Sequence, residues 1–221
     1  MREEASKSMQ DYLKNIYLII RENGGPVSTS ELAKKMRVSP PTVTSMLVKL
    51  GERKFVKYEK YKGVKLAKKG EAIALEVLRH HRLIETYLVE RLGYDWSEVH
   101  EEADVLEHHI SEKMELRIAN ALGNPKFDPH GAPIPSADLS SIAKDETTRL
   151  GEHISGDIVV IERVREREKE ELQYLAGIGM VPGKQVEVES VAPFGMVTIT
   201  NENGTHSLPK EIAMSIHVKK I

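Results

Sequence analysis

Apolar residues near the amino terminus recur with the spacing of packed helices. The first apolar stripe covers residues 13–20 and stops at the Gly and Pro residues of 24–26. Residues 28–31 form a Ser-Thr-Ser-Glu capping box that starts a second, short helix. Ser39 can cap a third helix that has Pro40 at its first position. The buried stripe of this third helix falls on Val43, Met46, Leu47 and Leu50.

The next segment predicts a basic hairpin. Apolar and basic residues alternate over residues 55–66, with a turn near residues 62–63. Two short helices followed by such a hairpin are typical of a winged helix-turn-helix, whose second helix enters the major groove of DNA. The candidate DNA-binding residues lie on the third helix and the wing: Ser39, Pro41, Thr42, Thr44, Ser45, Lys49, Lys60, Lys62 and Lys65.

The middle of the chain predicts long helices. From residue 71 to about residue 122 the pattern is helical throughout. An apolar seam near heptad spacing falls on Ile73, Val77, Ile84 and Leu88. Long helices with one apolar seam often dimerise, so we expect a homodimer. Its two recognition helices would lie about 34–36 Å apart and fit a palindromic operator.

The carboxy-terminal part predicts a linker and then a small barrel. Residues 135–155 are rich in Ser, Asp, Thr and Gly, which suits a flexible tether. Gly and Pro turns then separate short strand-like runs at 158–161, 185–188, 196–200 and 215–218. Five or so strands in this length imply a barrel, with Met180, Met196 and Met214 as ordinary core residues.

The composition narrows the class of protein. None of the 221 residues is a cysteine, which excludes disulfides and thiolate metal ligands. The chain shows no signal-peptide core, and no stretch approaches the roughly 18 consecutive apolar residues of a membrane span. We therefore expect a cytoplasmic protein with no membrane partner.

The net charge of −2 hides a strong asymmetry. Residues 1–70 carry 16 Lys and Arg against 7 Asp and Glu, a net charge of +9, whereas residues 71–221 carry 16 against 27, or −11. The basic part is the expected polyanion binder, and its affinity for DNA should fall steeply with salt because it comes largely from neutralised phosphates.

Acidic and imidazole groups concentrate at residues 100–109. Asp104, Glu107 and His108 stand at i, i+3 and i+4, so on one helix they share a face and can converge on one ion. A second group comprises His80, His81, Glu85 and His100. Oxygen and imidazole ligands suit manganese, ferrous iron, cobalt, nickel or zinc.

Other functions fit parts of this pattern. A run of charges on a helix is more often a solvated face, and the protein would then be a winged-helix regulator that answers a small organic ligand. A metal-dependent hydrolase is the second alternative. No HExxH or comparable catalytic signature is present, so the residues favour a sensor or a structural metal site over an enzyme. Loss of operator binding on adding a chelator would separate a metal sensor from the first alternative.

The chain closely resembles the diphtheria-toxin-repressor family of iron- and manganese-dependent repressors over essentially its whole length. The motifs that carry the likeness are DYLKNIYLI, SPPTVTSMLVKL with its wing, HHRLIETYL, SEVHEEADVLEHHIS and GNPKFDPHGAPIP. The run LAGIGMVPGKQVEVESVAPFG resembles the Src-homology-like barrel of these repressors and of an iron-transport accessory protein.

The resemblance implies two metal sites. The primary, activating site matches Asp11, Asp104, Glu107 and His108, and joins the first helix to the dimerisation helix. The ancillary site matches His81, Glu85 and His100, with Glu168 and Glu171 from the carboxy-terminal domain. Iron-type members carry Met and Cys where this chain has Asp11 and Asp104, and manganese-type members carry Glu where it has Lys14. The implied cofactor is Fe²⁺ or Mn²⁺, without the paired-metal site of the manganese type.

The predicted fold is mainly α with a small β part. Residues 1–72 are expected to form the winged-helix DNA-binding domain and residues 73–140 the helical metal-binding and dimerisation domain. A linker at 141–154 leads to the small β-barrel at 155–221. The expected function is a homodimeric, metal-dependent repressor of metal-homeostasis genes, not an enzyme.

Overall fold

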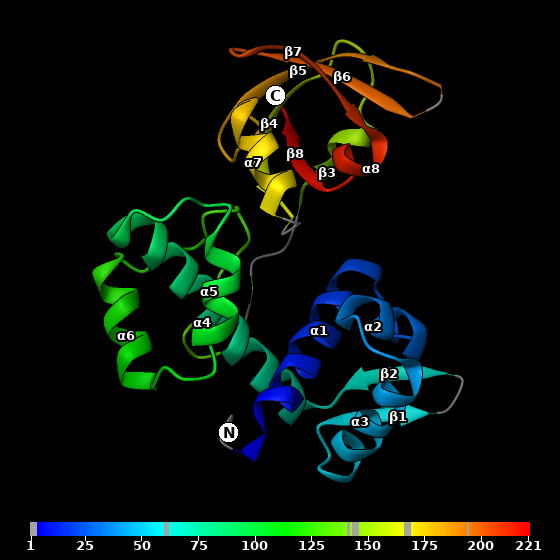
Figure 1. The fold of residues 1–221 in the computed structure, drawn as a ribbon, viewed down its shortest axis with the longest axis vertical. Coiled ribbons are helices and arrows are strands. Elements are labelled where there is room, and N and C mark those ends of the chain that lie inside the picture. The colour runs from blue at the N-terminus through cyan, green and yellow to red at the C-terminus, as the bar shows by residue number, and fades with distance from the viewer. Residues whose placement is uncertain (1–3, 60–61, 141, 143–145, 166–168, 194) are drawn as a thin grey trace. The chain divides into compact units, whose positions relative to one another are not determined.

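The computed structural model describes residues 4–59, 62–140, 142, 146–165, 169–193 and 195–221. Lys60 and Glu168 lie outside these residues. The chain divides into two compact units, the first comprising residues 1–81, 105–111 and 135–141, and the second residues 82–104, 112–134 and 142–221 (Figure 1). No helix of the described part is long and apolar enough to cross a membrane.

The first unit contains the winged helix that the sequence predicts. Its elements are α1 (Lys7–Asn23), α2 (Thr29–Met36), α3 (Pro40–Glu52), β1 (Val56–Glu59) and β2 (Gly63–Leu66), followed by the start of α4 (Lys68–Leu92). The predicted capping box of α2 is present, and the Ser39 side chain accepts a hydrogen bond from the Thr42 backbone N–H. Local side-chain chemistry therefore sets where these helices begin.

One core joins the three helices to the wing. Leu13, Ile16, Leu32, Val43, Leu47, Leu50 and Phe55 are fully buried. β1 and β2 pair in antiparallel register, with Tyr58 opposite Val64, and Val64 also pairs with Val27. Gly70 lies where a Cβ would be 2.0 Å from the Phe55 carbonyl oxygen, so only glycine lets α4 approach the hairpin so closely.

The sequence pattern predicts helix throughout the middle of the chain, but the structure shows three separate helices there. α4 ends at Leu92, where Gly93 adopts a positive φ of 73°, and α5 (Val99–Leu106) and α6 (Glu112–Ala121) follow as separate helices. In the second unit, Leu83 packs with Ile118, Ala119 and Ile134. The four residues of the predicted apolar seam are also buried in the single chain, so their burial does not require a dimer contact.

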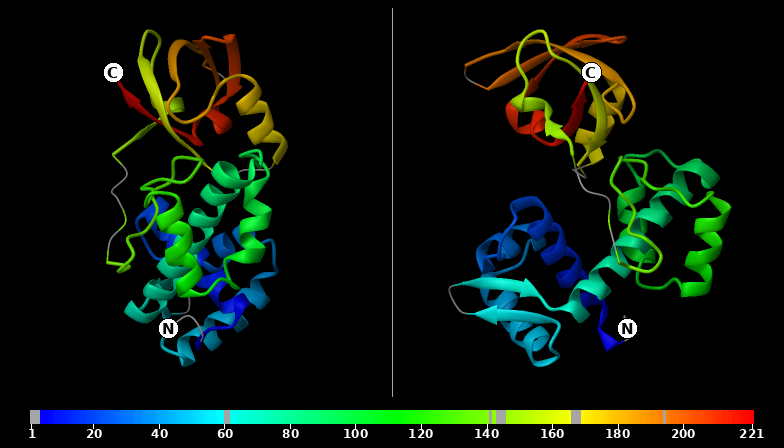
Figure 2. Two further views of the ribbon diagram at one scale, coloured as in Figure 1. Left: turned by 90° about the vertical axis from the view of Figure 1, so that its left-hand side faces the viewer. Right: turned by 180° about the vertical axis from the view of Figure 1, so that it is seen from behind.

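The carboxy-terminal part of the second unit is a curved antiparallel sheet. Its strands run in the order β3-β8-β4-β5-β6-β7. They are β3 (Thr148–Arg149), β4 (Ile158–Val164), β5 (Gln185–Val191), β6 (Met196–Asn201), β7 (Gly204–Pro209) and β8 (Ile216–Lys220). With them come η2 (Leu150–Glu152), α7 (Lys169–Gly177) and α8 (Lys210–Ala213). The further views in Figure 2 show that the strands bend into a strongly curved sheet.

The barrel begins earlier than its sequence pattern suggests. Thr148 pairs with Val218 of β8, and Leu150 is fully buried in the barrel core, although both fall in the predicted linker at 141–154. β7 and α7 were not predicted from the sequence. Of the three methionines predicted for the core, Met180 is fully buried and the other two are half-buried.

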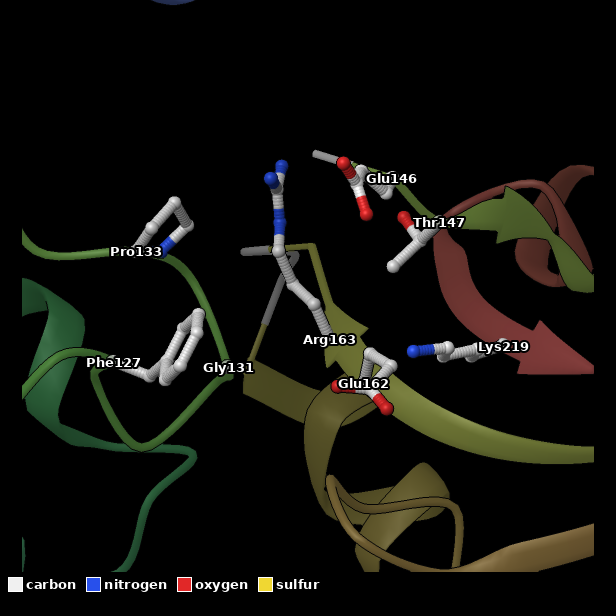
Figure 3. A pocket seen from close by; sticks show the side chains of 8 residues that line it. All are labelled: Phe127, Gly131, Pro133, Glu146, Thr147, Glu162, Arg163 and Lys219. Carbon is white, nitrogen blue, oxygen red and sulfur yellow. The ribbon is translucent and has the colours of Figure 1, made fainter. Parts of the chain in front are cut away.

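A loop before the barrel docks on β4. The His130 carbonyl accepts a hydrogen bond of 2.9 Å from the Val164 backbone N–H. Gly131 has a positive φ of 82°, and a Cβ there would lie 2.0 Å from the Glu162 carbonyl oxygen. Beside this contact lies a pocket of about 150 Å³, with Phe127 and Pro133 on one side and Thr147 and Lys219 on the other (Figure 3).

Candidate metal centres and DNA-binding face

The first candidate metal centre joins α1 to the turn after α5. One ligand atom each of Asp11, Glu107 and His108 lies within 4.8 Å of the others. His108 Nε2 is 2.8 Å from Asp11 Oδ1 and 3.2 Å from Glu107 Oε1. Glu107 is fully buried, and Asp11 is half-buried on α1. The structure therefore brings together three of the four residues of the predicted primary set.

The tautomer of His108 suits metal ligation. The Gln10 side chain donates through Nε2 to the Ala5 carbonyl, which leaves its Oε1 to accept from His108 Nδ1 at 2.7 Å. The proton of a neutral His108 is therefore on Nδ1, and the lone pair of Nε2 faces two carboxylate oxygens. Electron-rich atoms in such an arrangement repel one another unless a cation lies among them, and a histidine held through its other nitrogen is typical of metal sites.

Asp104, Glu107 and His108 do not share one helical face. α5 ends at Leu106, and Glu107 and His108 lie in the following turn. The Glu107 carbonyl accepts from His80 Nδ1 at 3.1 Å, so it is engaged by a side chain of α4 and the helix does not continue. The prediction of one shared helical face was therefore wrong, since Glu107 and His108 approach Asp11 from a turn.

The Glu107 carboxylate has two further partners in the first unit. Lys14 Nζ lies 2.8 Å from Oε1 and 2.9 Å from Oε2. His81 Nδ1 lies 2.6 Å from Oε2. Lys14 is one helical turn after Asp11 on α1, so the same helix brings both an acid and a buried ammonium to this centre.

Asp104 and the predicted ancillary residues are divided between the units. Asp104 lies in the second unit, where its Oδ2 is 3.6 Å from His100 Nε2. His100 Nδ1 is 3.4 Å from Glu85 Oε1. His81 lies in the first unit, and Glu171 is half-buried on α7. Within the described part of the chain, no close group of possible metal ligands includes Glu171.

A second acidic cluster lies in the second unit and was missed from the sequence, apart from Glu85. Ligand atoms of Glu85, Asp128 and His130 lie within 4.8 Å of one another, and all three residues are buried. His130 Nε2 is 2.9 Å from the Trp96 carbonyl, which can only accept, so the lone pair of a neutral His130 is on Nδ1. That atom lies 3.8 Å from Glu85 Oε2.

The nearby cationic side chains only partly balance the negative charge of this second cluster. Burial, and then the charge of Glu85, raises the pKa of Asp128 to about 6, although the Arg82 guanidinium acts in the opposite direction. Arg82 Nε is 3.4 Å from Asp128 Oδ2. Two adjacent buried carboxylates suit a bound divalent cation, and the imidazole of His130 adds a nitrogen donor.

A local signal for this cluster was present in the sequence. Asp128 and His130 stand two residues apart in the Pro- and Gly-containing segment at 125–135. Asp128 Oδ1 accepts from the backbone N–H groups of His130 and Ala132, both at 2.9 Å, as an Asp in a tight turn commonly does. An Asp and a His fixed in one turn are potential ligands, but their partner Glu85 becomes apparent only in the folded chain.

The candidate DNA-binding face lies on α3 and the wing. The predicted residues of α3 and its cap are all exposed. Ser39 and Thr42 share a hydroxyl hydrogen bond of 2.8 Å, and the Thr44 hydroxyl donates to the Pro40 carbonyl. On the wing, Lys62 and Lys65 are exposed, and Lys62 pairs with Glu59 at 2.7 Å. The small hydroxyl side chains leave room for a base edge to approach the helix.

The fold and these sites define a winged-helix DNA-binding protein with buried carboxylate and imidazole clusters. Residues 4–64 match the family model for the iron-dependent repressor N-terminal DNA-binding domain, and residues 67–136 match that for its metal-binding and dimerisation domain. Residues 148–220 match the FeoA domain. The chain therefore belongs to the iron-dependent repressor family, whose members are transcriptional repressors and not enzymes.

Similar proteins support this assignment across the chain. The iron-dependent repressor IdeR of Mycobacterium leprae (strain TN) is 32% identical, over 95% of this chain and 96% of its own length. A solved manganese-dependent transcriptional repressor in complex with manganese is 36% identical, with a TM-score of 0.89, over 96% of this chain and all of that one. The structure of ScaR with bound Zn²⁺ is 32% identical, with a TM-score of 0.82, over 96% and 99% of the two chains.

Proposed function

We propose that this repressor is activated when a divalent metal ion, Mn²⁺ or Fe²⁺, binds at Asp11, Glu107 and His108. The single observation that carries the proposal is the His108 Nε2 atom, which lies beside carboxylate oxygens from two distant segments. An ion there would bridge α1 to the turn after α5. The ion would then hold α1, and with it the rest of the winged helix, against the turn after α5.

The metal-free state explains why binding would act as a switch. Asp11 Oδ1 lies 2.8 Å from His108 Nε2, whose lone pair repels it, and this repulsion favours a looser ensemble when no ion is present. A metal that binds the ordered arrangement better shifts the population toward it. Operator DNA binds the ordered arrangement too, so metal and DNA would each raise the affinity for the other.

The nature of the metal follows from the ligands. The donors are hard carboxylate oxygens and one imidazole, which suit manganese and ferrous iron. Solved relatives contain manganese in one case and Zn²⁺ in another, so several divalent ions fit such a fold. We assign the Glu85, Asp128 and His130 cluster as a second ion site. Asp104 as a primary ligand, and His81, Glu85, His100, Glu168 and Glu171 as ancillary ligands, remain predictions from the family resemblance.

We further propose that the active form is a cytoplasmic homodimer on a palindromic operator of metal-homeostasis genes. The second unit exposes apolar side chains that a dimer contact could bury: Leu92, Tyr94, Met114 and Leu116. The family model that matches residues 67–136 describes a dimerisation domain. We propose that the DNA-binding domain spans residues 1–72 and the metal-binding and dimerisation domain residues 73–140. The linker starts at residue 141, and the barrel starts at Thr148 instead of residue 155.

Operator binding measured by fluorescence anisotropy tests the proposal. The full chain is titrated into labelled duplexes drawn from a random-sequence selection, with Mn²⁺, Fe²⁺, Zn²⁺ or a chelator present. We expect specific binding with Mn²⁺ or Fe²⁺ and its loss on adding the chelator. Equal binding with and without metal would contradict the proposal and favour a regulator that answers another ligand.

A further inference from the structure

The protein's own donors already occupy most of the acceptor positions of the Glu107 carboxylate. Each of its oxygens has two close nitrogen neighbours: Lys14 and His108 at Oε1, and Lys14 and His81 at Oε2. A carboxylate offers about four lone-pair positions. Lys14 and His81 donate to three of them, and the remaining side of Oε1 faces the lone pair of His108 Nε2. An ion bound between Glu107 and His108 therefore shares Oε1 with the Lys14 ammonium.

Lys14 is the contact that opposes a metal most strongly. Its ammonium is a compact positive charge that spans both oxygens, and its side chain is only 9% exposed. An ion sharing Glu107 would lie close to this charge in a region with little water, where repulsion is weakly screened. The flexible four-carbon stem of lysine also allows the ammonium to withdraw without moving the helix.

The same ammonium protects the metal-free protein. A buried carboxylate that loses its charged partner strongly destabilises a fold. Lys14 and Glu107 are 93 residues apart in the sequence, so their ion pair joins α1 to the turn after α5 without any metal. In the metal-free state this pair supplies part of the connection that we assign to the ion.

We propose that Lys14 is a built-in competitor of the activating metal. Its ammonium neutralises Glu107 when no ion is present, and an arriving ion must share Oε1 with this positive charge or displace it. Lys14 thereby raises the metal concentration at which the repressor becomes active. This inference rests on the proposed function, because it concerns the affinity of the same centre.

The test measures Mn²⁺ binding to the full chain by isothermal titration calorimetry and thermal unfolding with and without Mn²⁺. The variant is Lys14→Met, which keeps the length of the side chain and removes the charge. The control is Lys7→Met, which removes an exposed lysine from the same helix. Both are also made in a His130→Ala background, so that the second cluster does not contribute to the titration.

We expect Lys14→Met to bind Mn²⁺ at least about tenfold more tightly, since one opposing charge is removed. Its metal-free Tm should fall and its Mn²⁺-induced rise in Tm should exceed that of the wild type. Lys7→Met should match the wild type in both measurements. Unchanged or weaker Mn²⁺ affinity in Lys14→Met, with wild-type binding intact, would overturn the inference alone. Absence of Mn²⁺ binding by the wild type would instead overturn the proposed function.

A second variant, Lys14→Gln, provides the test if Lys14→Met does not fold without metal. Lys14→Gln keeps a hydrogen-bond donor for Glu107 but removes the positive charge. It should also bind Mn²⁺ more tightly than the wild type, by a smaller factor. Wild-type affinity in Lys14→Gln would show that the charge of Lys14 does not compete with the ion.

Discussion

The two acidic clusters contain similar ligands but lie beside different cationic side chains. In the first unit, Lys14 Nζ lies within 2.9 Å of both oxygens of Glu107. In the second, Arg82 Nε lies 3.4 Å from one oxygen of Asp128, and the pKa of Asp128 is raised to about 6. The first cluster is thus neutralised closely, and the second only in part.

This difference suggests different roles for the two clusters. The first joins α1 to a turn that is distant in sequence, so an ion there acts on the DNA-binding part. The second includes His130, whose carbonyl binds the β4 backbone, so an ion there acts on the attachment of the loop to the barrel. Because its own charge is less well compensated, the second cluster should depend more on pH and on a bound cation.

The largest effect is expected from Arg82→Met, which removes the one arginine partner of Asp128 that the described part of the structure shows. Breaking a buried ion pair by deleting one partner costs about 3–5 kcal/mol. We expect a loss of this order in the metal-free free energy of unfolding, measured by urea denaturation, and partial recovery in Arg82→Met with Asp128→Asn. A loss below about 1 kcal/mol would show that Arg82 does not compensate this cluster.

The next effect concerns pH and Asp128. Its pKa is higher in the folded chain, about 6, than the ordinary value of 3.8, so the folded state holds an extra proton between these values. Stability should therefore fall as pH rises from about 4 to 6 and remain lower above pH 6, by a total of about 3 kcal/mol.

Asp128→Asn should remove this pH dependence while keeping the oxygen that accepts from the His130 and Ala132 backbones. Urea unfolding at pH 4 to 7 with a chelator measures the difference between variant and wild type. That difference should grow toward pH 7 in favour of the variant. A difference that is constant with pH would mean that Asp128 does not titrate in this range.

A direct comparison of the clusters uses His108→Ala and His130→Ala. We expect His108→Ala to weaken metal-activated operator binding about 100-fold, the upper range for changes around a metal ion, and His130→Ala to weaken it less than about tenfold. Fluorescence anisotropy at fixed salt and saturating Mn²⁺ gives both values. If His130→Ala had the larger effect, the second cluster would be the activating one.

The smallest expected effect concerns metal choice. Asp11→Met with Asp104→Cys replaces hard oxygen donors by softer sulfur, which suits later metals than manganese. We expect the ratio of operator affinity with Mn²⁺ to that with Fe²⁺ or Co²⁺, each at saturation, to fall about tenfold. Retention of the wild-type ranking of metals would remove these two residues as determinants of selectivity.

Much of the first unit follows from the sequence because its signals are local. The Ser28 and Ser39 caps each accept from a backbone N–H three residues away, and the wing pairs residues of one short hairpin. The barrel was harder to predict. β3 is only two residues long, and β7 lacks the alternation of apolar and polar residues, so their positions depend on pairing with β8 and β6.

The sequence by itself determined the winged helix, the charge asymmetry and the types of side chain available for a metal. The tertiary structure decided which of these side chains meet. It ended α5 before Glu107, placed Lys14 on the carboxylate of Glu107, and brought Glu85 to the turn that holds Asp128 and His130. The physical reason is distance along the chain: caps and turns form between neighbouring residues, whereas a buried ion site requires segments that only packing brings together.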